Sequence, residues 1–323
     1  MSGNLKFAVK QLWHRLQLPV ARRLGRAARK NRRVYDLVLF NRELELLEVR
    51  LGYLDPVVDV FVIGESETTF IGEKKPLWFA QNRERFKKYE GKIRHVVIPP
   101  PAPEDYETSA SNPAVKSAEH YHRRALRAGV TDGRDEDVVL YSDADEIPSR
   151  AAVEQLIGLL QLGHAEAIFR MRWHVLYLNA LAVAYVGPAA GHRCEWFGTV
   201  GTTVKNFRDK FDGDANRLWQ FRWGEMNQCL IRILDGGWHF SYLGGLERLA
   251  QKQRDNAYRV RDPAEIAALH RREFASVKFE FRDSAGKFPA ELEPHLAPIR
   301  EMTGSEKQLA GELAKFAAEE LPG

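Results

Sequence analysis

Cysteines are nearly absent from this sequence. Only Cys194 and Cys229 occur among 323 residues, without a Cys-x-x-Cys pair or a Cys/His cluster. This pattern excludes a disulfide framework and a zinc site of the usual ligand spacing. We interpret both cysteines as small apolar side chains of a protein in a reducing compartment.

Long apolar runs are missing as well. No segment approaches the roughly 20 apolar residues of a membrane-spanning helix, and the start of the chain lacks the apolar core of a signal peptide. Residues 34–290 contain neither a repeat nor a low-complexity linker. The sequence therefore predicts a cytoplasmic protein with a single domain over residues 34–290 and a helical tail over residues 291–323.

Acidic residues are absent from the start of the chain. Residues 1–33 contain ten lysines and arginines, which leaves 38 basic against 44 acidic residues in the other 290. Four apolar residues before Pro19 have helical spacing: Leu5, Val9, Leu12 and Leu16. We interpret residues 1–33 as a basic amphipathic leader able to lie on an anionic membrane, such as the inner face of a cell membrane. A nucleic-acid arm, a partner-binding helix and an unstructured leader are the alternatives, because charge alone does not select the polyanion.

Apolar strands alternate with helices in the first half of the chain. Strands are predicted over residues 34–40, 57–63, 93–98 and 138–141. Helices are predicted over residues 42–54, 82–89 and 115–128. This alternation is typical of an α/β fold with a mostly parallel, doubly wound sheet. The second half is less regular, with strands expected at residues 167–178, 229–234 and 238–242, and helices at residues 246–258 and 305–319.

The most informative segment follows the strand at residues 138–141. Asp143, Asp145 and Glu146 come directly after it, and Pro148 then prevents further strand pairing. The carboxyl ends of buried strands are the places where open α/β sheets bind their ligands. Carboxylates suit Mg²⁺ or Mn²⁺, which usually complete their shell with substrate phosphates. Glu146 has a second interpretation, as a plain charge at the start of the next helix.

Six blocks of the sequence resemble glycosyltransferase family 17. They follow one another in order, at residues 41–51, 55–59, 62–70, 75–77, 142–148 and 237–241. The resemblance implies a GT-A type fold, a divalent metal ion, inversion at the anomeric carbon and a UDP-sugar donor, which is UDP-N-acetylglucosamine in eukaryotic members. Residues 179–228 match the family poorly, so we expect an irregular acceptor-side half and infer no particular acceptor.

The resemblance gives the acids and one histidine a role in binding the donor. Asp145 is the expected direct metal ligand, and Asp143 the expected ribose or water-mediated partner. His239, which follows the Gly236-Gly237 pair, is the expected third ligand. A histidine buried in an aromatic core is the alternative for His239.

Further polar residues follow the first strands, where a nucleotide docks on an α/β sheet. Donor contacts are expected from Asn41, Glu43, Glu65, Ser66 and Lys75. Arg123 suits the donor diphosphate, because a planar guanidinium matches phosphate oxygens. An ordinary surface pair between Arg123 and Glu119, four residues earlier, is the alternative. Lys75 has the alternative of facing water.

An inverting transfer also needs a general base that takes the proton of the acceptor hydroxyl. The acceptor-side half offers four carboxylates: Glu195, Asp209, Glu225 and Asp235. Glu225, between Trp223-Gly224 and the strand that begins at Cys229, is the first candidate. Glu195, beside Trp196, is the second.

Together these features predict a metal-dependent inverting glycosyltransferase. It would move a sugar, N-acetylglucosamine first, from a UDP-sugar to a hydroxyl of an oligosaccharide, glycolipid or glycoprotein, and nucleic acid is not an expected partner. One alternative is a nucleotidyltransferase acting on sugar phosphates, although residues 40–43 are not the Gly-rich phosphate loop typical of that class. The other is a non-catalytic protein that binds glycans or nucleic acid.

Overall fold

The computed structural model describes residues 3–108, 116–186, 194–222, 231–245, 248–249, 276–282 and 288–318. The predicted base Glu225 and most of the predicted helix at residues 246–258 lie outside these residues.

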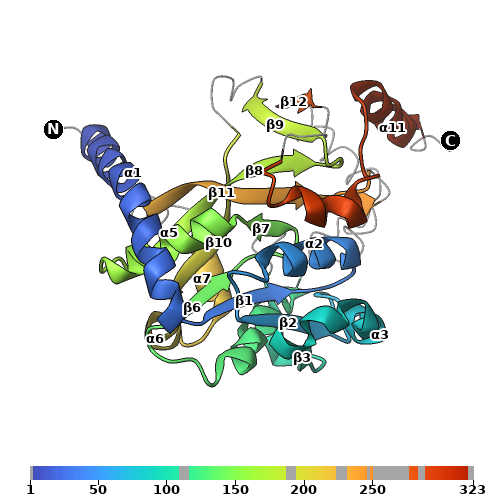
Figure 1. Ribbon diagram of the computed structural model, residues 1–323. Coiled ribbons are helices and arrows are strands. Elements are labelled where there is room, and N and C mark those ends of the chain that lie inside the picture. The colour runs from blue at the N-terminus through green and yellow to red at the C-terminus, as the bar shows by residue number, and fades with distance from the viewer. Residues whose placement is uncertain are drawn as a thin grey trace.

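A ten-stranded sheet runs through the centre of the molecule (Figure 1). Its first half is parallel, in the order β3 (Ile93–Ile98), β2 (Val60–Ser66), β1 (Val34–Leu39) and β6 (Val138–Tyr141). Its second half is mixed and comprises β10 (Trp196–Thr203), β8 (Glu166–Val175), β9 (Ala180–Tyr185), β12 (Val277–Phe281), β11 (Ile231–Ser241) and β7 (Glu146–Pro148). β10 is antiparallel to β6 and β8, whereas β11 is parallel to β8. A separate pair consists of β4 (Glu107–Thr108) and β5 (Lys116–Ser117).

Helices cover both faces of this sheet. One face is packed against α1 (Gly3–Ala28), α2 (Leu44–Leu54), α5 (Arg150–Gln161) and the 3₁₀ helix η6 (Glu293–Ile299). The other face is packed against η4 (Leu126–Val130), α6 (Val204–Asp209) and α7 (Ala215–Gln220). Shorter elements and the last helix are η1 (Arg29–Asn31), α3 (Trp78–Gln81), η2 (Arg83–Lys92), η3 (Pro103–Asp105), α4 (Glu119–Ala125) and α11 (Glu306–Ala318). The predicted α/β fold is confirmed.

Strand β1 shows how alternation divides the core. Val34 and Val38 face the cluster that contains α2 and α5, whereas Tyr35 and Leu37 face the cluster that contains η4, α6 and α7. Asp36 lies between them and shares the face of Val34 and Val38, because successive side chains of a strand alternate. A carboxylate thus enters an otherwise apolar layer, where it needs a partner.

Helix α1 continues past Pro19 to Ala28 and lies along α5 (Figure 1). The two helices approach closely, since a Cβ atom at Gly158 would lie 1.8 Å from the carbonyl oxygen of Ala21. Arg22 Nε donates to Glu154 Oε2 at 2.8 Å across the same contact. Within the described part of the chain, none of the helices combines the length and apolar character needed to cross a membrane.

Several element boundaries differ from those predicted. The second strand begins at Val60 rather than at residue 57, because the backbone N–H groups of Val57 and Val58 donate to the Leu54 carbonyl and close α2. The predicted helix at residues 82–89 is the 3₁₀ helix η2. The two strands predicted at residues 229–234 and 238–242 form one strand, β11, with a bulge between Ile233 and Gly237.

Candidate functional site

A cleft with an empty volume of about 1200 Å³, open to solvent, lies at the carboxyl ends of β1, β2 and β6. Most of the residues predicted for the site line it: Asn41, Glu43, Ser66, Lys75, Arg123, Asp143, Asp145 and His239. The carboxyl ends of the parallel strands β1, β2 and β6 bring Asn41, Ser66, Asp143 and Asp145 to one edge of the sheet. The cleft is large enough for a nucleotide-sized ligand.

Backbone pairing brings His239 to the acids. β11 pairs antiparallel with β7, and the N–H of Phe240 donates to the carbonyl oxygen of Asp145 at 2.8 Å. The close approach depends on Gly237, which has a φ of 141°. A Cβ atom there would lie 2.1 Å from the carbonyl oxygen of Ile147, so any other residue would push β11 away from the acidic loop.

Asp145 and His239 form a buried pair in the cleft. His239 Nε2 lies 3.6 Å from Asp145 Oδ1, and both side chains are almost fully buried. The Trp196 ring stacks on the imidazole, with 4.1 Å between the ring centroids. Two ligands roughly 2.1 Å from one ion lie about 3.0–3.5 Å apart, so this separation fits a shared divalent cation after a small adjustment.

The described residues nowhere bring three or more His, Cys, Asp or Glu side chains into a metal-binding group. Asp145 and His239 could hold a cation only as a partial site, and its remaining ligands would have to be water or substrate oxygens. Of the three predicted ligands, the structure brings these two together and gives Asp143 different neighbours.

Asp143 faces two arginines. Its Oδ2 lies 3.0 Å from Arg222 Nη2, and its Oδ1 lies 3.8 Å from Arg123 Nη2. Arg222 Nη1 also donates to both carboxylate oxygens of Glu146, at 2.5 and 2.6 Å. Burial raises the pKa of Glu146, and the positive charge of Arg222 opposes this. Asp143 and Glu146, on either side of Asp145, thus share a buried guanidinium that the sequence did not predict.

Arg123 is buried below the cleft, and its pair with Glu119 is no surface feature. Its Nη2 donates to Glu119 Oε1 at 2.5 Å, its Nε to the Tyr141 hydroxyl at 2.9 Å and its Nη1 to Asn216 Oδ1 at 3.1 Å. The Trp219 ring lies under the guanidinium, 4.0 Å away. Burial lowers the pKa of Arg123, but Tyr141 and Glu119 outweigh it and the net pKa is raised. Arg123 therefore keeps a fixed positive charge at the cleft.

Arg50 holds the acidic loop from below, and it was not predicted either. It is fully buried on α2 and forms a two-pronged pair with Asp36, both distances being 2.7 Å. Its Nη1 donates to the backbone carbonyl oxygens of Glu146 at 2.6 Å and Asp143 at 3.3 Å, and its Nη2 to Ser142 Oγ at 2.7 Å. The backbone on both sides of Asp145 is therefore tied to the core.

The lining of the cleft also includes Lys75, Ser66 and His122. Burial and the positive charge of Lys75 lower the pKa of His122 to about 4, so the imidazole is neutral near pH 7. Ser66 Oγ lies 3.2 Å from Thr68 Oγ1. Lys75 thus supplies positive charge beside neutral groups that can accept or donate hydrogen bonds.

Two predicted site residues lie away from the cleft. Glu65 is fully buried and accepts a hydrogen bond from the Phe79 N–H at 2.7 Å, at the start of α3. Glu195 pairs with Arg170 at 2.9 Å. Neither contributes to the lining of the cleft.

Comparison with known proteins confirms the predicted resemblance. Residues 22–171 match the family model for glycosyltransferase family 17. Over 128 residues the chain is 35% identical to the β-1,4-mannosyl-glycoprotein 4-β-N-acetylglucosaminyltransferases of Rattus norvegicus and Homo sapiens. The aligned segment covers 38% of this chain and 23% of each relative, so the chain matches about a quarter of their length.

Solved structures resemble the chain more distantly. Glucosyl-3-phosphoglycerate synthase from Mycobacterium tuberculosis, in complex with Mn²⁺, UDP-glucose and glycerol 3-phosphate, matches 77% of this chain and 82% of its own, at 15% identity and a TM-score of 0.36. A 4-diphosphocytidyl-2C-methyl-D-erythritol synthase from Anaerococcus prevotii matches 70% of this chain and 98% of its own, at 12% identity and a TM-score of 0.38.

Proposed function

We propose, from the family 17 match of residues 22–171 and the geometry of the cleft, that this chain is a metal-dependent inverting glycosyltransferase. The observation that carries the proposal is the buried pair of Asp145 and His239, 3.6 Å apart, beside two buried arginines at a sheet edge. The donor we propose is a UDP-sugar, with UDP-N-acetylglucosamine first because the curated relatives are named as N-acetylglucosaminyltransferases. The acceptor is a hydroxyl of a glycan.

The donor would lie along the cleft with its diphosphate near Asp145. Asn41 and Ser66, at the ends of β1 and β2, would contact the nucleoside. Lys75 would add positive charge on the same side. In a partly buried site, a fixed positive charge attracts a phosphate more strongly than the same charge does in bulk water.

Arg222 and Arg123 would allow the negatively charged diphosphate of the donor to bind beside the acidic loop. Unpaired, Asp143 and Glu146 would repel a diphosphate bound beside Asp145. Arg222 contacts both of them and offsets one of the two negative charges, and Arg123 adds a second guanidinium on the Asp143 side. A divalent cation held by Asp145 and His239 would supply the remaining neutralisation as the diphosphate leaves.

Calorimetry with UDP tests the proposal. We expect UDP to bind with Mn²⁺ present, and its affinity to fall roughly tenfold or more when the metal is chelated, because the cation bridges protein and phosphates. Equal binding with and without metal would contradict the metal-dependent function. Preference for UTP over UDP would favour the nucleotidyltransferase alternative, and UDP-sugar turnover would then decide between the two.

We also propose that α1 rests on an anionic surface at the cytoplasmic face of a membrane. Leu16 and Val20, four residues apart on one side of the helix, are 65% and 55% exposed, and Arg23 follows one turn later. This apolar strip with neighbouring basic residues is typical of interfacial helices.

Substitution of the exposed strip tests the membrane proposal. The double variant Leu16→Asp/Val20→Asp is expected to lose most sedimentation with phosphatidylserine vesicles, because each new carboxylate opposes both burial and the negative surface. Val97→Asp, at an exposed apolar position of β3 away from α1, is the control and should sediment normally. Unchanged sedimentation of the double variant would remove this proposal.

A further inference from the structure

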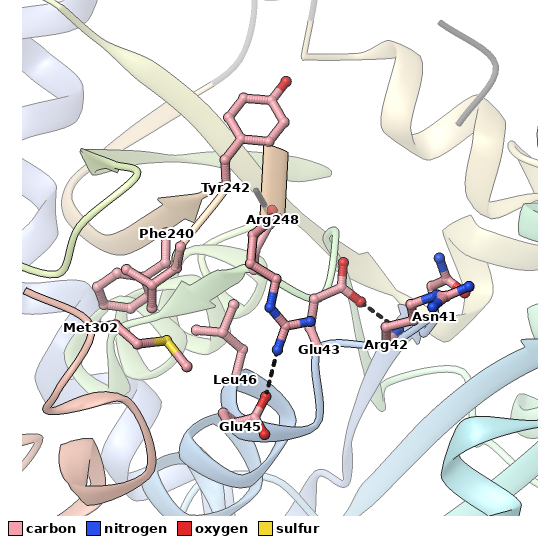
Figure 2. A pocket seen from close by; sticks show the side chains of 11 residues that line it. Asn41, Arg42, Glu43, Glu45, Leu46, Phe240, Tyr242, Arg248 and Met302 are labelled. Atoms are coloured by element: carbon pink, nitrogen blue, oxygen red, sulfur yellow. Dashed lines mark hydrogen bonds and ion pairs between the residues drawn. The ribbon is translucent and has the colours of Figure 1, made fainter. Parts of the chain in front are cut away.

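A second, smaller hollow opens beside the cleft, with an empty volume of about 540 Å³ (Figure 2). Its apolar lining comes from four side chains: Leu46, Phe240, Leu243 and Met302. Its polar lining includes Glu43, Glu45 and Arg248. Glu45 pairs with Arg248 at 3.5 Å across the hollow, as Figure 2 shows. An apolar surface with a few charged groups suits one ring of a sugar, which has both an apolar face and hydroxyl groups.

The two hollows meet at four residues: Asn41, Glu43, Asp145 and Tyr242. A ligand in the smaller hollow would therefore point toward the place where the donor's diphosphate is proposed to bind. Tyr242 stands at this junction in a left-handed backbone conformation, with a φ of 55°. Such a conformation is costly for a tyrosine and is often found at functional sites.

We propose that the smaller hollow binds the acceptor sugar and that Glu43 is the base for its attacking hydroxyl. This inference rests on the proposed function. In the transfer, the acceptor oxygen forms a bond to the anomeric carbon of the donor sugar while its proton passes to a carboxylate oxygen of Glu43. The bond from the anomeric carbon to the β-phosphate oxygen breaks, and its electron pair leaves with UDP.

Position singles out Glu43 among the carboxylates. Among the described residues shared by the two hollows, only Glu43 and Asp145 are acidic, and Asp145 is the proposed metal ligand. Glu43 Oε2 accepts the backbone N–H of Arg42 at 3.0 Å, a bond that orients the carboxylate at the end of β1 (Figure 2). Glu43 is thus moved from the predicted role of donor contact to that of catalytic base.

Two other carboxylates of the larger cleft, Glu119 and Asp143, do not line the smaller hollow. Glu119 pairs with Arg123, and Asp143 lies 3.0 Å from Arg222. Glu195, the second base candidate, lies outside both hollows.

Charge also restricts the acceptor. Glu43, Glu45 and Asp145 line the smaller hollow together with Arg42 and Arg248. This balance offers no excess of positive charge, so a neutral hexose fits the hollow better than a sialylated or phosphorylated sugar.

The test compares Glu43→Gln with Glu48→Gln, a glutamate of α2 that lines neither hollow. The assay measures UDP release from UDP-N-acetylglucosamine with Mn²⁺, in water and with a panel of neutral methyl hexopyranosides. Glu43→Gln should release UDP about 10²- to 10⁴-fold more slowly than the wild type, because the base is lost. Its affinity for UDP should stay within about twofold, since it leaves the donor contacts intact.

Two further measurements separate a base from a structural residue. With Mn²⁺ kept saturating at each pH, the wild-type rate should fall as the base is protonated, and this part of the pH dependence should be missing from the residual rate of Glu43→Gln. Glu43→Asp should recover part of the rate.

The assignment of Glu43 as the base would be overturned if Glu43→Gln released UDP at nearly the wild-type rate. It would also be overturned if Glu225→Gln, and not Glu43→Gln, showed the 10²- to 10⁴-fold loss of rate. Failure of the wild type to bind UDP or to release it from any UDP-sugar would instead refute the proposed function.

Discussion

Asp145→Asn is expected to abolish sugar transfer and leave the fold intact. The asparagine keeps the volume and the buried position of the aspartate, and the backbone hydrogen bond from Phe240 to residue 145 does not involve the side chain. The substitution removes the negative charge that would hold the divalent cation beside His239. Loss of Lewis-acid neutralisation is worth several kcal/mol, so UDP release should fall by about 10³-fold.

The measurement combines turnover, calorimetry and thermal unfolding. Asp145→Asn should lose the effect of Mn²⁺ on UDP affinity and should unfold within a few degrees of the wild type. Asp135→Asn, an exposed carboxylate far from the cleft in a loop before β6, is the matched control and should keep full turnover. A variant at position 145 that retains metal-dependent UDP binding would show that the cation is held elsewhere.

The order of the elements made much of the site predictable. Acids that follow an apolar strand must lie at the sheet edge, and the structure places Asp143 and Asp145 in the cleft there. The same reasoning did not place Glu65, which follows the strand predicted at residues 57–63 but lies within β2, where backbone N–H groups of α3 bind its carboxylate. Position at a strand end therefore predicts proximity to the cleft, but it does not predict which partner a side chain finds.

The sequence did not predict the site residues whose partners are distant along the chain. Arg222 reaches Asp143 and Glu146 across more than seventy residues, and no local pattern marks it. The antiparallel strands β9 and β10 were missed for the same reason, since their pairing depends on β8 and β6 rather than on a clear alternation of their own.

Arg50 and Asp36 did leave a signal in the sequence. Asp36 interrupts the apolar strand at residues 34–38, and Arg50 lies among the apolar residues of the helix at residues 44–54. Opposite charges at two positions predicted to be buried indicate an ion pair, because an isolated buried charge is too costly. What the sequence could not show is that this pair also binds the backbone of the acidic loop.

Arg50→Met is expected to destabilise the protein more than any surface change. It leaves the carboxylate of Asp36 buried without its partner, which typically costs about 3–5 kcal/mol in the free energy of unfolding. Urea unfolding followed by circular dichroism measures this loss. Arg85→Met, which removes an exposed pair with Glu48, is the control and should cost less than about 1 kcal/mol.

A double variant separates the two tasks of Arg50. Arg50→Met/Asp36→Leu leaves no unpaired charge in the core, so it should recover most of the stability that the single variant loses. It still lacks the donors to the carbonyl oxygens of Asp143 and Glu146, so Asp145 is no longer held from below. We therefore expect its Mn²⁺-dependent UDP affinity to remain about 10- to 100-fold weaker than that of the wild type, as when a supporting contact of a metal ligand is removed. If the double variant regains stability and UDP affinity together, Arg50 serves the core alone, and the loop that carries Asp145 keeps its shape without it.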